Sequence, residues 1–85
     1  MRLEGKLFRQ NLMIREATVE QPETGLLFVQ HLEQALISLC RQIESPLPIL
    51  LEKNTHEFAR FHQTIFFDGQ FTERIDFDRF QIRLL

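Results

Sequence analysis

The feature that most constrains this chain is a two-residue alternation at its C-terminal end. Polar and apolar side chains take turns there, as Arg79, Phe80, Gln81, Ile82, Arg83 and Leu84. Successive side chains of a β-strand point to opposite faces, so the pattern predicts a strand with one apolar and one cationic face. We expect the strand to span residues 75–85, with a bulge or bend near Asp78 and Arg79, and its apolar face to be buried against a helix.

The N-terminal residues 1–19 also have strand periodicity, because Leu3, Gly5 and Leu7 alternate with charged side chains. Asn11 tolerates the left-handed backbone of a tight turn, which would make this region a hairpin. Gln-Asn is a weaker turn dipeptide than Asn-Gly, so one long strand with a bulge is the alternative. The sequence leaves both interpretations open.

Two helices are predicted between these strands. Residues 25–44 carry apolar side chains at helical spacing, with Thr24 as a candidate N-cap. The segment 45–48 ends this helix, and Pro48 suits the first turn of a second helix that reaches about Phe61. The connection is short, so we expect the two helices to form an antiparallel pair.

The order of elements predicts the fold class. A short strand over residues 62–67 and a turn at Asp68 and Gly69 follow the helices, before the closing strand. Strands at both ends with helices between them predict a single α+β domain over residues 1–85. We expect a small, mostly antiparallel sheet of three to four strands, with the helix pair packed on one face. The nine Phe residues are interpreted as core, since Phe has no polar group.

Composition narrows the classes of function. The net charge of −2 gives no global attraction to nucleic acid or to an anionic membrane. There is no apolar run of about 18 residues, and the first residues are charged, so we expect a cytoplasmic bacterial protein without a membrane segment. The one cysteine, Cys40, has no partner for an internal disulfide.

Several segments resemble a known family. They are Arg2-Leu-Glu-Gly-Lys-Leu-Phe at the start, Pro46-Leu-Pro-Ile-Leu-Leu with Asn54 and Glu57-Phe58 in the middle, and Ile75-Asp-Phe-Asp near the end. These segments are similar to a family of short hypothetical proteins from Gram-positive, often anaerobic, bacteria. The resemblance spans most of the chain and consists of packing and turn patterns. It implies no established activity and transfers no functional residues.

Two surfaces are candidate binding sites. Arg2, Lys6, Arg79 and Arg83 are expected on the uncovered face of the sheet, where they could bind an anion or a phosphate backbone. The alternative is the mixture of solvated charges that open sheet faces commonly carry. A nucleic-acid surface should also expose aromatic rings, and Phe8 is the candidate.

The second candidate surface is a protein interface. The apolar stripe of the first helix extends beyond what one core needs, and Leu26 and Ile37 lie at its margin. We expect this margin, or an open sheet edge, to mediate self-association. The alternative is that the second helix covers the extra width.

Other residues resemble parts of metal or catalytic sites. These are His56, Glu57, His62 and Asp68 in one region, and Asp76 and Asp78 in another. The spacing of His56 and His62 is not that of a zinc-binding helix. Asp76-Phe-Asp78 resembles the Asp-x-Asp that metal-dependent transferases use, but such a pair is also common by chance, so we interpret all these residues as solvated or turn residues. Cys40 lies on the apolar helical stripe and is expected to be buried and inert. We therefore assign no catalytic, cofactor-binding or metal-binding residues.

The sequence favours a small non-catalytic protein that acts through a protein interface, with a homodimer as one form. Anion or nucleic-acid binding through the arginine-lined sheet face is the alternative. A metal-dependent enzyme that uses the histidines and aspartates is the third and weakest hypothesis. No partner protein is identified by the residues.

Overall fold

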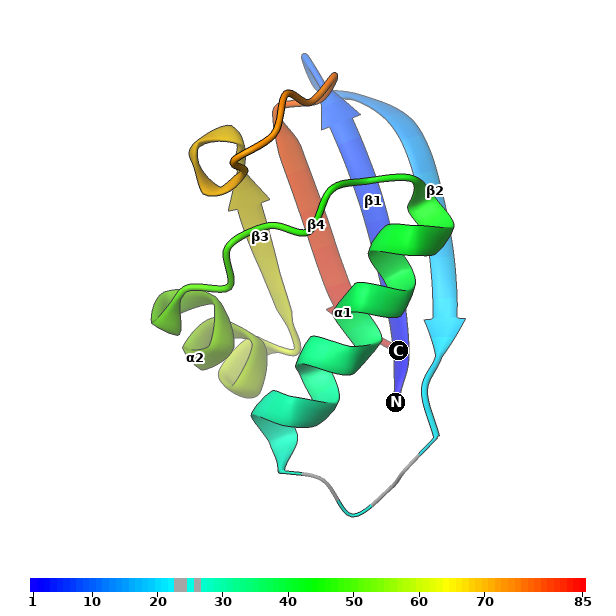
Figure 1. The fold of residues 1–85 in the computed structure, drawn as a ribbon, viewed down its shortest axis with the longest axis vertical. Helices are drawn as coiled ribbons and strands as arrows, with labels where there is room; N and C mark the ends of the chain where they lie inside the picture. The colour runs from blue at the N-terminus through cyan, green and yellow to red at the C-terminus, as the bar shows by residue number, and fades with distance from the viewer. Residues whose placement is uncertain (23–24, 26) are drawn as a thin grey trace.

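The fold is a four-stranded antiparallel sheet with two helices on one of its faces (Figure 1). The computed structural model describes residues 1–22, 25 and 27–85. The elements are β1 (Arg2–Arg9), β2 (Leu12–Glu20), α1 (Phe28–Ile43), α2 (Glu52–Phe61), β3 (Gln63–Phe67), a 3₁₀ turn (Asp68–Gln70) and β4 (Arg79–Leu84). The strand order is β2-β1-β4-β3. The predicted α+β class, with its small antiparallel sheet, is confirmed.

The first two strands form a hairpin. Gln10 and Asn11 both adopt positive φ, at 51° and 66°, which is the backbone of a two-residue turn that suits twisted strands. The pairing of the strands shifts between Leu7 and Phe8, so a bulge interrupts the ladder. Of the two interpretations of residues 1–19, the hairpin is therefore the one observed.

The closing strand lies in the middle of the sheet, between β1 and β3. Phe80 and Ile82 are fully buried in a core that includes α1, as the alternation predicted. The strand begins only at Arg79, so the prediction that it spans residues 75–85 was too long at its N-terminal end. Instead, residues 75–78 form a loop, whose Asp78 backbone N–H donates to the Phe8 carbonyl at 2.9 Å.

α1 lies across β1 and β2 (Figure 1), and its Leu39 side chain packs against the backbone of Gly5. A Cβ atom at Gly5 would lie 2.8 Å from Cδ2 of Leu39 and 3.0 Å from Cε1 of Phe80. Both side chains are fully buried, and Gly5 pairs with Ile82 in the neighbouring strand. The absent side chain of Gly5 therefore provides the space into which the helix packs.

The helices begin later than the sequence predicted. α2 starts at Glu52, so Pro48 lies outside it. The preceding segment is held in place by long-range bonds, because the Ile49 N–H donates to the Gln70 carbonyl at 2.7 Å. α1 starts at Phe28 rather than at residue 25, and the predicted N-cap Thr24 lies outside the described residues.

A buried polar network attaches α2 to the edge of the sheet. The Asn54 side chain is fully buried and uses all of its hydrogen-bonding capacity. Its Nδ2 donates to Thr64 Oγ1 at 2.9 Å and to the Ile65 carbonyl at 3.1 Å, and its Oδ1 accepts from Leu51 N–H and Gln70 Nε2. Since the Ile65 carbonyl lies on the outer edge of β3, this network covers that edge.

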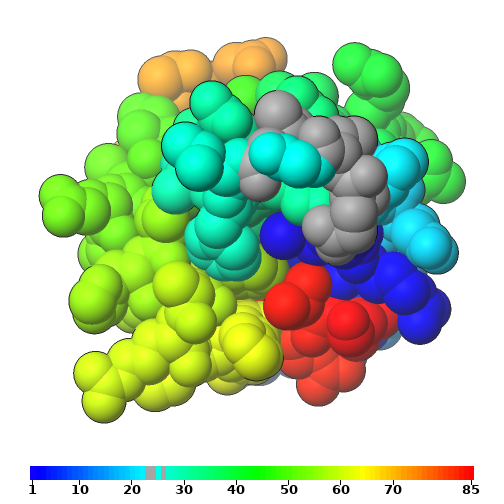
Figure 2. Space-filling view, turned by 90° about the horizontal axis from the view of Figure 1, so that it is seen from below, coloured from blue at the N-terminus to red at the C-terminus, as the bar shows by residue number. Residues whose placement is uncertain are grey.

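The two ends of the chain lie side by side at one end of the molecule (Figure 2). Met1 and Gln21 exchange both backbone bonds at the end of the hairpin, and the Leu85 N–H donates to the Arg2 carbonyl at 3.0 Å. On the helical side of the sheet, α1 and α2 meet through the rings of Phe28 and Phe58, whose centroids are 5.9 Å apart. Two broad surfaces are exposed: the face of the sheet away from the helices, and the outer side of the helices.

The packing at Gly5 gives a direct test of the fold. We expect Gly5→Ala to lower the free energy of unfolding by about 1–3 kcal/mol, because the new methyl group overlaps Leu39. Gly69→Ala is the matched control, since a Cβ atom at that position would meet no other atom within 4 Å, and it should change the stability by less than about 1 kcal/mol. Urea denaturation measures both. A Gly5→Ala variant as stable as the wild type would contradict this packing.

Candidate functional site

The four predicted cations share the uncovered face of the sheet. Lys6 pairs with Gln81, and Glu4 pairs with Arg83, across β1 and β4. Arg2 lies two residues before Glu4 in β1, and Arg79 lies two residues before Gln81 in β4, so both point to the same face as these residues. Since residues of one parity point to one side of a sheet, all four cations lie on the face away from the helices.

Carboxylates balance most of this charge. Glu4 lies between two of the cations, with its Oε1 at 3.9 Å from Lys6 Nζ and 3.5 Å from Arg83 Nε. Glu20 of β2 is the cross-strand neighbour of Arg2. Opposite charges at facing positions stabilise a sheet modestly and leave little free potential for an anion. The structure therefore brings these cations to one face without concentrating positive charge there.

Arg79 differs from the other three. Its guanidinium carbon lies 4.5 Å from the ring centroid of Phe8, which pairs with it across the strands. The Nε atom is buried and has no hydrogen-bond partner, and Arg79 makes no ion pair within the described part of the chain. A cation on an aromatic face is attracted to the ring yet keeps donors free for a ligand.

A groove of about 300 Å³ lies between α2 and the outer edge of the sheet. Lys53, Glu57 and Phe61 line it from α2, at a four-residue spacing that places them in one row. Gln63, Thr64, Ile65 and Phe67 line it from β3. Glu57 is held in place because its Oε1 accepts a hydrogen bond from Thr64 Oγ1 at 2.7 Å.

Two exposed phenylalanines beside this groove were missed by the sequence interpretation. Phe61 is 61% exposed and Phe67 is 48% exposed, although the Phe residues were interpreted as core, with Phe8 as the candidate for an exposed ring. Lys53 Nζ lies 5.7 Å from the Phe67 ring centroid, and the Arg60 guanidinium lies 5.4 Å from that of Phe61. The sequence signal for their exposure is that Phe61 is the last residue of α2 and Phe67 the last residue of β3.

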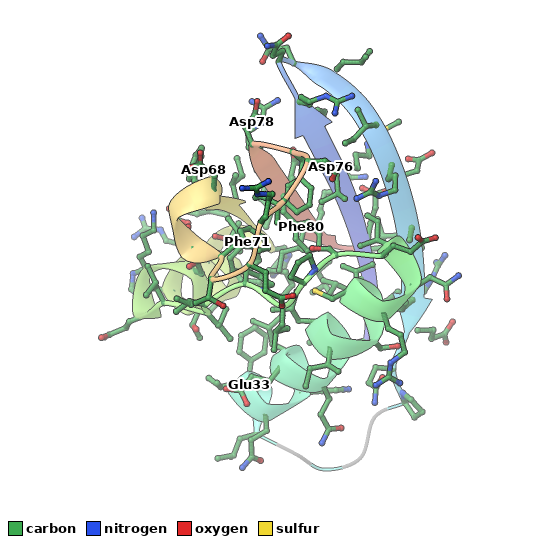
Figure 3. The ribbon with its side chains drawn as sticks, turned by 45° about the horizontal axis from the view of Figure 1, so that its top comes forward. Glu33, Asp68, Phe71, Asp76, Asp78 and Phe80 are labelled. Carbon is green, nitrogen blue, oxygen red and sulfur yellow. The ribbon has the colours of Figure 1, made fainter. Side chains whose placement is uncertain are left out.

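The outer side of α1 carries the predicted interface residue Ile37, which is 44% exposed. Its predicted companion, Leu26, lies outside the described residues. A second groove, of about 200 Å³, lies beside Ile37 and is lined by Glu33, Leu36, Ile37, Leu47, Pro48 and Leu50. Glu33 lies on the outer surface of α1 (Figure 3), and Leu47 is 51% exposed. Residues 44–51, the linker between α1 and α2, thus leave part of the α1 surface uncovered.

The aspartates near the C-terminus have structural partners. Asp76 and Asp78 lie in the loop that leads into β4, rather than on the strand (Figure 3). Arg15 binds both carboxylate oxygens of Asp76 at 3.2 Å, and these hydrogen bonds lower the pKa of Asp76 below its usual value. The Gln10 N–H donates to the Asp78 carboxylate at 2.9 Å. Both side chains therefore fix the loop against the hairpin.

Within the described residues, the remaining candidates do not form a metal-binding group. Among residues 1–22, 25 and 27–85, no group of three or more His, Cys, Asp or Glu side chains is placed to hold a metal ion. His56 and His62 are both exposed, and His62 ends α2 with a left-handed backbone. No helix in this described part has the length and apolar character needed to cross a membrane.

Comparisons with known proteins add no assignment. No family model, no curated protein and no solved structure matches this chain. The resemblance to short proteins of Gram-positive bacteria therefore stays a prediction, and the functional argument depends on the surfaces described above.

Cys40 offers a test of its predicted inertness. Its thiol is buried on the core side of α1, and burial raises its pKa to about 12. Because the thiolate is the reactive form, we expect an aromatic disulfide reagent at pH 8 to label the native protein roughly 100-fold or more slowly than the unfolded chain. The chain in concentrated guanidinium is the reference. Equal labelling rates in the two states would show that Cys40 is accessible.

Proposed function

We propose that this protein acts through a protein–protein interface, as a homodimer that forms along the outer side of α1. The observation that carries the proposal is the row Val29, Glu33, Ile37 and Arg41, which we call the α1 ridge. All four side chains are exposed, and they follow one another at four-residue spacing. Rows of this spacing interdigitate in the commonest class of helix packing, so the ridge is a ready surface for a second helix.

The charges of the α1 ridge favour a second copy of the same chain. Ile37 lies midway between an acidic residue, Glu33, and a basic residue, Arg41. If two copies cross antiparallel at Ile37, a two-fold axis places Glu33 of each copy opposite Arg41 of the other. A parallel arrangement would instead place like charges together. Neither residue has an ion pair within the described part of the chain, so both are available.

The groove beside the ridge supports the same occupant. Its floor and walls are mainly apolar, from Leu36, Leu47, Pro48 and Leu50, and Ile37 forms one side. An apolar side chain of a second copy would fill this groove and displace water from it. Ile49 and Leu51, on either side of Leu50 in the sequence, are also exposed apolar side chains. Monomeric proteins seldom leave an extended apolar patch in contact with water.

The open edge of β2 is less suited to self-association. Met1 and Gln21 exchange both backbone bonds, so in the antiparallel pattern the N–H and C=O groups of Glu16, Thr18 and Glu20 point away from β1. If a second copy of β2 paired antiparallel at this edge with Thr18 opposite Thr18, Glu16 of each copy would face Glu20 of the other. Like charges at facing positions oppose such pairing, and charged residues commonly protect edge strands.

The arginine-lined sheet face remains a second candidate only in a narrower form. Lys6 and Arg83 share Glu4, and Arg2 faces Glu20, which argues against a broad anion site. Arg79 and its surroundings are the part of this face that supports ligand binding. A cytoplasmic location belongs to the same proposal, and its support is the free buried thiol of Cys40, which suits a reducing compartment.

Sedimentation of an α1 ridge variant tests the homodimer. We expect the wild type to dimerise with a dissociation constant on the order of 1–100 μM, and Ile37→Glu to stay monomeric, because the change buries a carboxylate at the two-fold axis. Gln42→Glu is the matched control, since it adds the same charge to an exposed position of α1 away from the ridge. A wild type that is monomeric throughout this range, or equal dimerisation by Ile37→Glu, would rule out the proposed interface.

A further inference from the structure

Three exposed or half-exposed phenylalanines each have a cation over the ring. The pairs are Arg79 over Phe8 at 4.5 Å, Lys53 over Phe67 at 5.7 Å and Arg60 over Phe61 at 5.4 Å. None of these cations forms an ion pair within the described part of the chain, whereas Lys6 and Arg83 share Glu4. These three cations therefore combine an unpaired charge with a neighbouring aromatic ring that is at least partly exposed.

These rings and cations lie along one continuous surface. Across the uncovered face, the register aligns Met13 of β2, Phe8 of β1, Arg79 of β4 and Phe67 of β3 in one row. Beyond Phe67, the groove between β3 and α2 leads to Phe61, with Lys53 on the α2 side. Neighbouring strands are about 4.8 Å apart, so the backbones at Phe8 and Phe67 are roughly 10 Å apart, with Arg79 between them.

We propose that this surface binds single-stranded nucleic acid. Every base offers a flat face that stacks on a phenylalanine ring, and adjacent cations attract the phosphates. Phe67 and Phe61 are the stacking positions for bases, because they are the most exposed of the three rings. Arg79, which is paired with Phe67 across the strands, is the phosphate contact. Lys53 in the groove and Arg60 beside Phe61 act in the same way.

Single strands fit this surface better than duplexes. The bases of a duplex are stacked within the helix and cannot reach isolated rings, whereas unpaired bases can be splayed onto them. The net charge of −2 and the groove carboxylate of Glu57 give little long-range attraction, so the affinity must come from these contacts. The surface is separate from the α1 ridge, and the inference thus goes beyond the proposed self-association.

Fluorescence anisotropy with labelled oligouridine and oligothymidine of about 12 nucleotides tests the proposal. We expect salt-dependent binding at low ionic strength, with a dissociation constant on the order of 10–100 μM. Phe67→Leu should weaken binding about fivefold or more through lost stacking. Arg79→Gln should also weaken it and should reduce the salt slope by about 0.7. Arg83→Gln, on the same face but paired with Glu4, is the control and should stay within about twofold of the wild type.

Three outcomes would overturn the proposal. The first is no change in anisotropy with either oligonucleotide when the folded wild type is in large excess. The second is binding of a duplex of the same length that is equal to or tighter than that of the single strands. The third is an equal loss of binding in Arg83→Gln and Arg79→Gln, which would indicate general charge attraction. Circular dichroism and urea denaturation confirm that each variant is folded, so a loss of binding reports on the surface itself.

Discussion

The arrangement of this molecule depends on the contact between Leu39 of α1 and the bare backbone at Gly5. A side chain at Gly5 would displace the Leu39 side chain or the helix that carries it, since its Cβ would overlap Leu39 and make a tight contact with Phe80. The contact sets how closely α1 lies on β1, and the apolar stripe of α1 sets which side of the helix is buried. Because α1 is seated on β1 in this way, Glu33, Ile37 and Arg41 are left on the exposed side of the helix.

The second constraint is the polar network at Asn54, which has a different physical character. A buried amide with all of its hydrogen bonds made is costly to disturb, since any displaced partner would lose its bond in a dry environment. The network fixes α2 along β3 and so creates the groove between Lys53 and Phe67. The same side chain, Asn54, thus both covers the edge of β3 and shapes the groove beside it.

Local sequence patterns predicted the fold class and the core. Features that depend on contacts between distant residues were not predicted. The alternation at Phe80 and Ile82 and the helical stripe of α1 identified the core, because periodicity is a property of the sequence itself. The loop at residues 75–78 was mistaken for strand because its position is set by Arg15, which is distant in the sequence. The cationic face, with Glu4 among its residues, was predicted. The contact of Arg83 with Glu4 depends on strand register, and the exposure of Phe61 and Phe67 depends on how α2 packs.

The central claim is that the α1 ridge pairs with a second copy in an antiparallel orientation. The most direct measurement is sedimentation of Glu33→Arg and Arg41→Glu, each alone and then mixed in equal amounts. The account predicts that each variant alone is monomeric, because like charges meet across the axis, and that the mixture forms a one-to-one heterodimer with both charge pairs restored. Dimerisation of either variant alone as strong as that of the wild type, or a mixture that stays monomeric under conditions where the wild type dimerises, would contradict it.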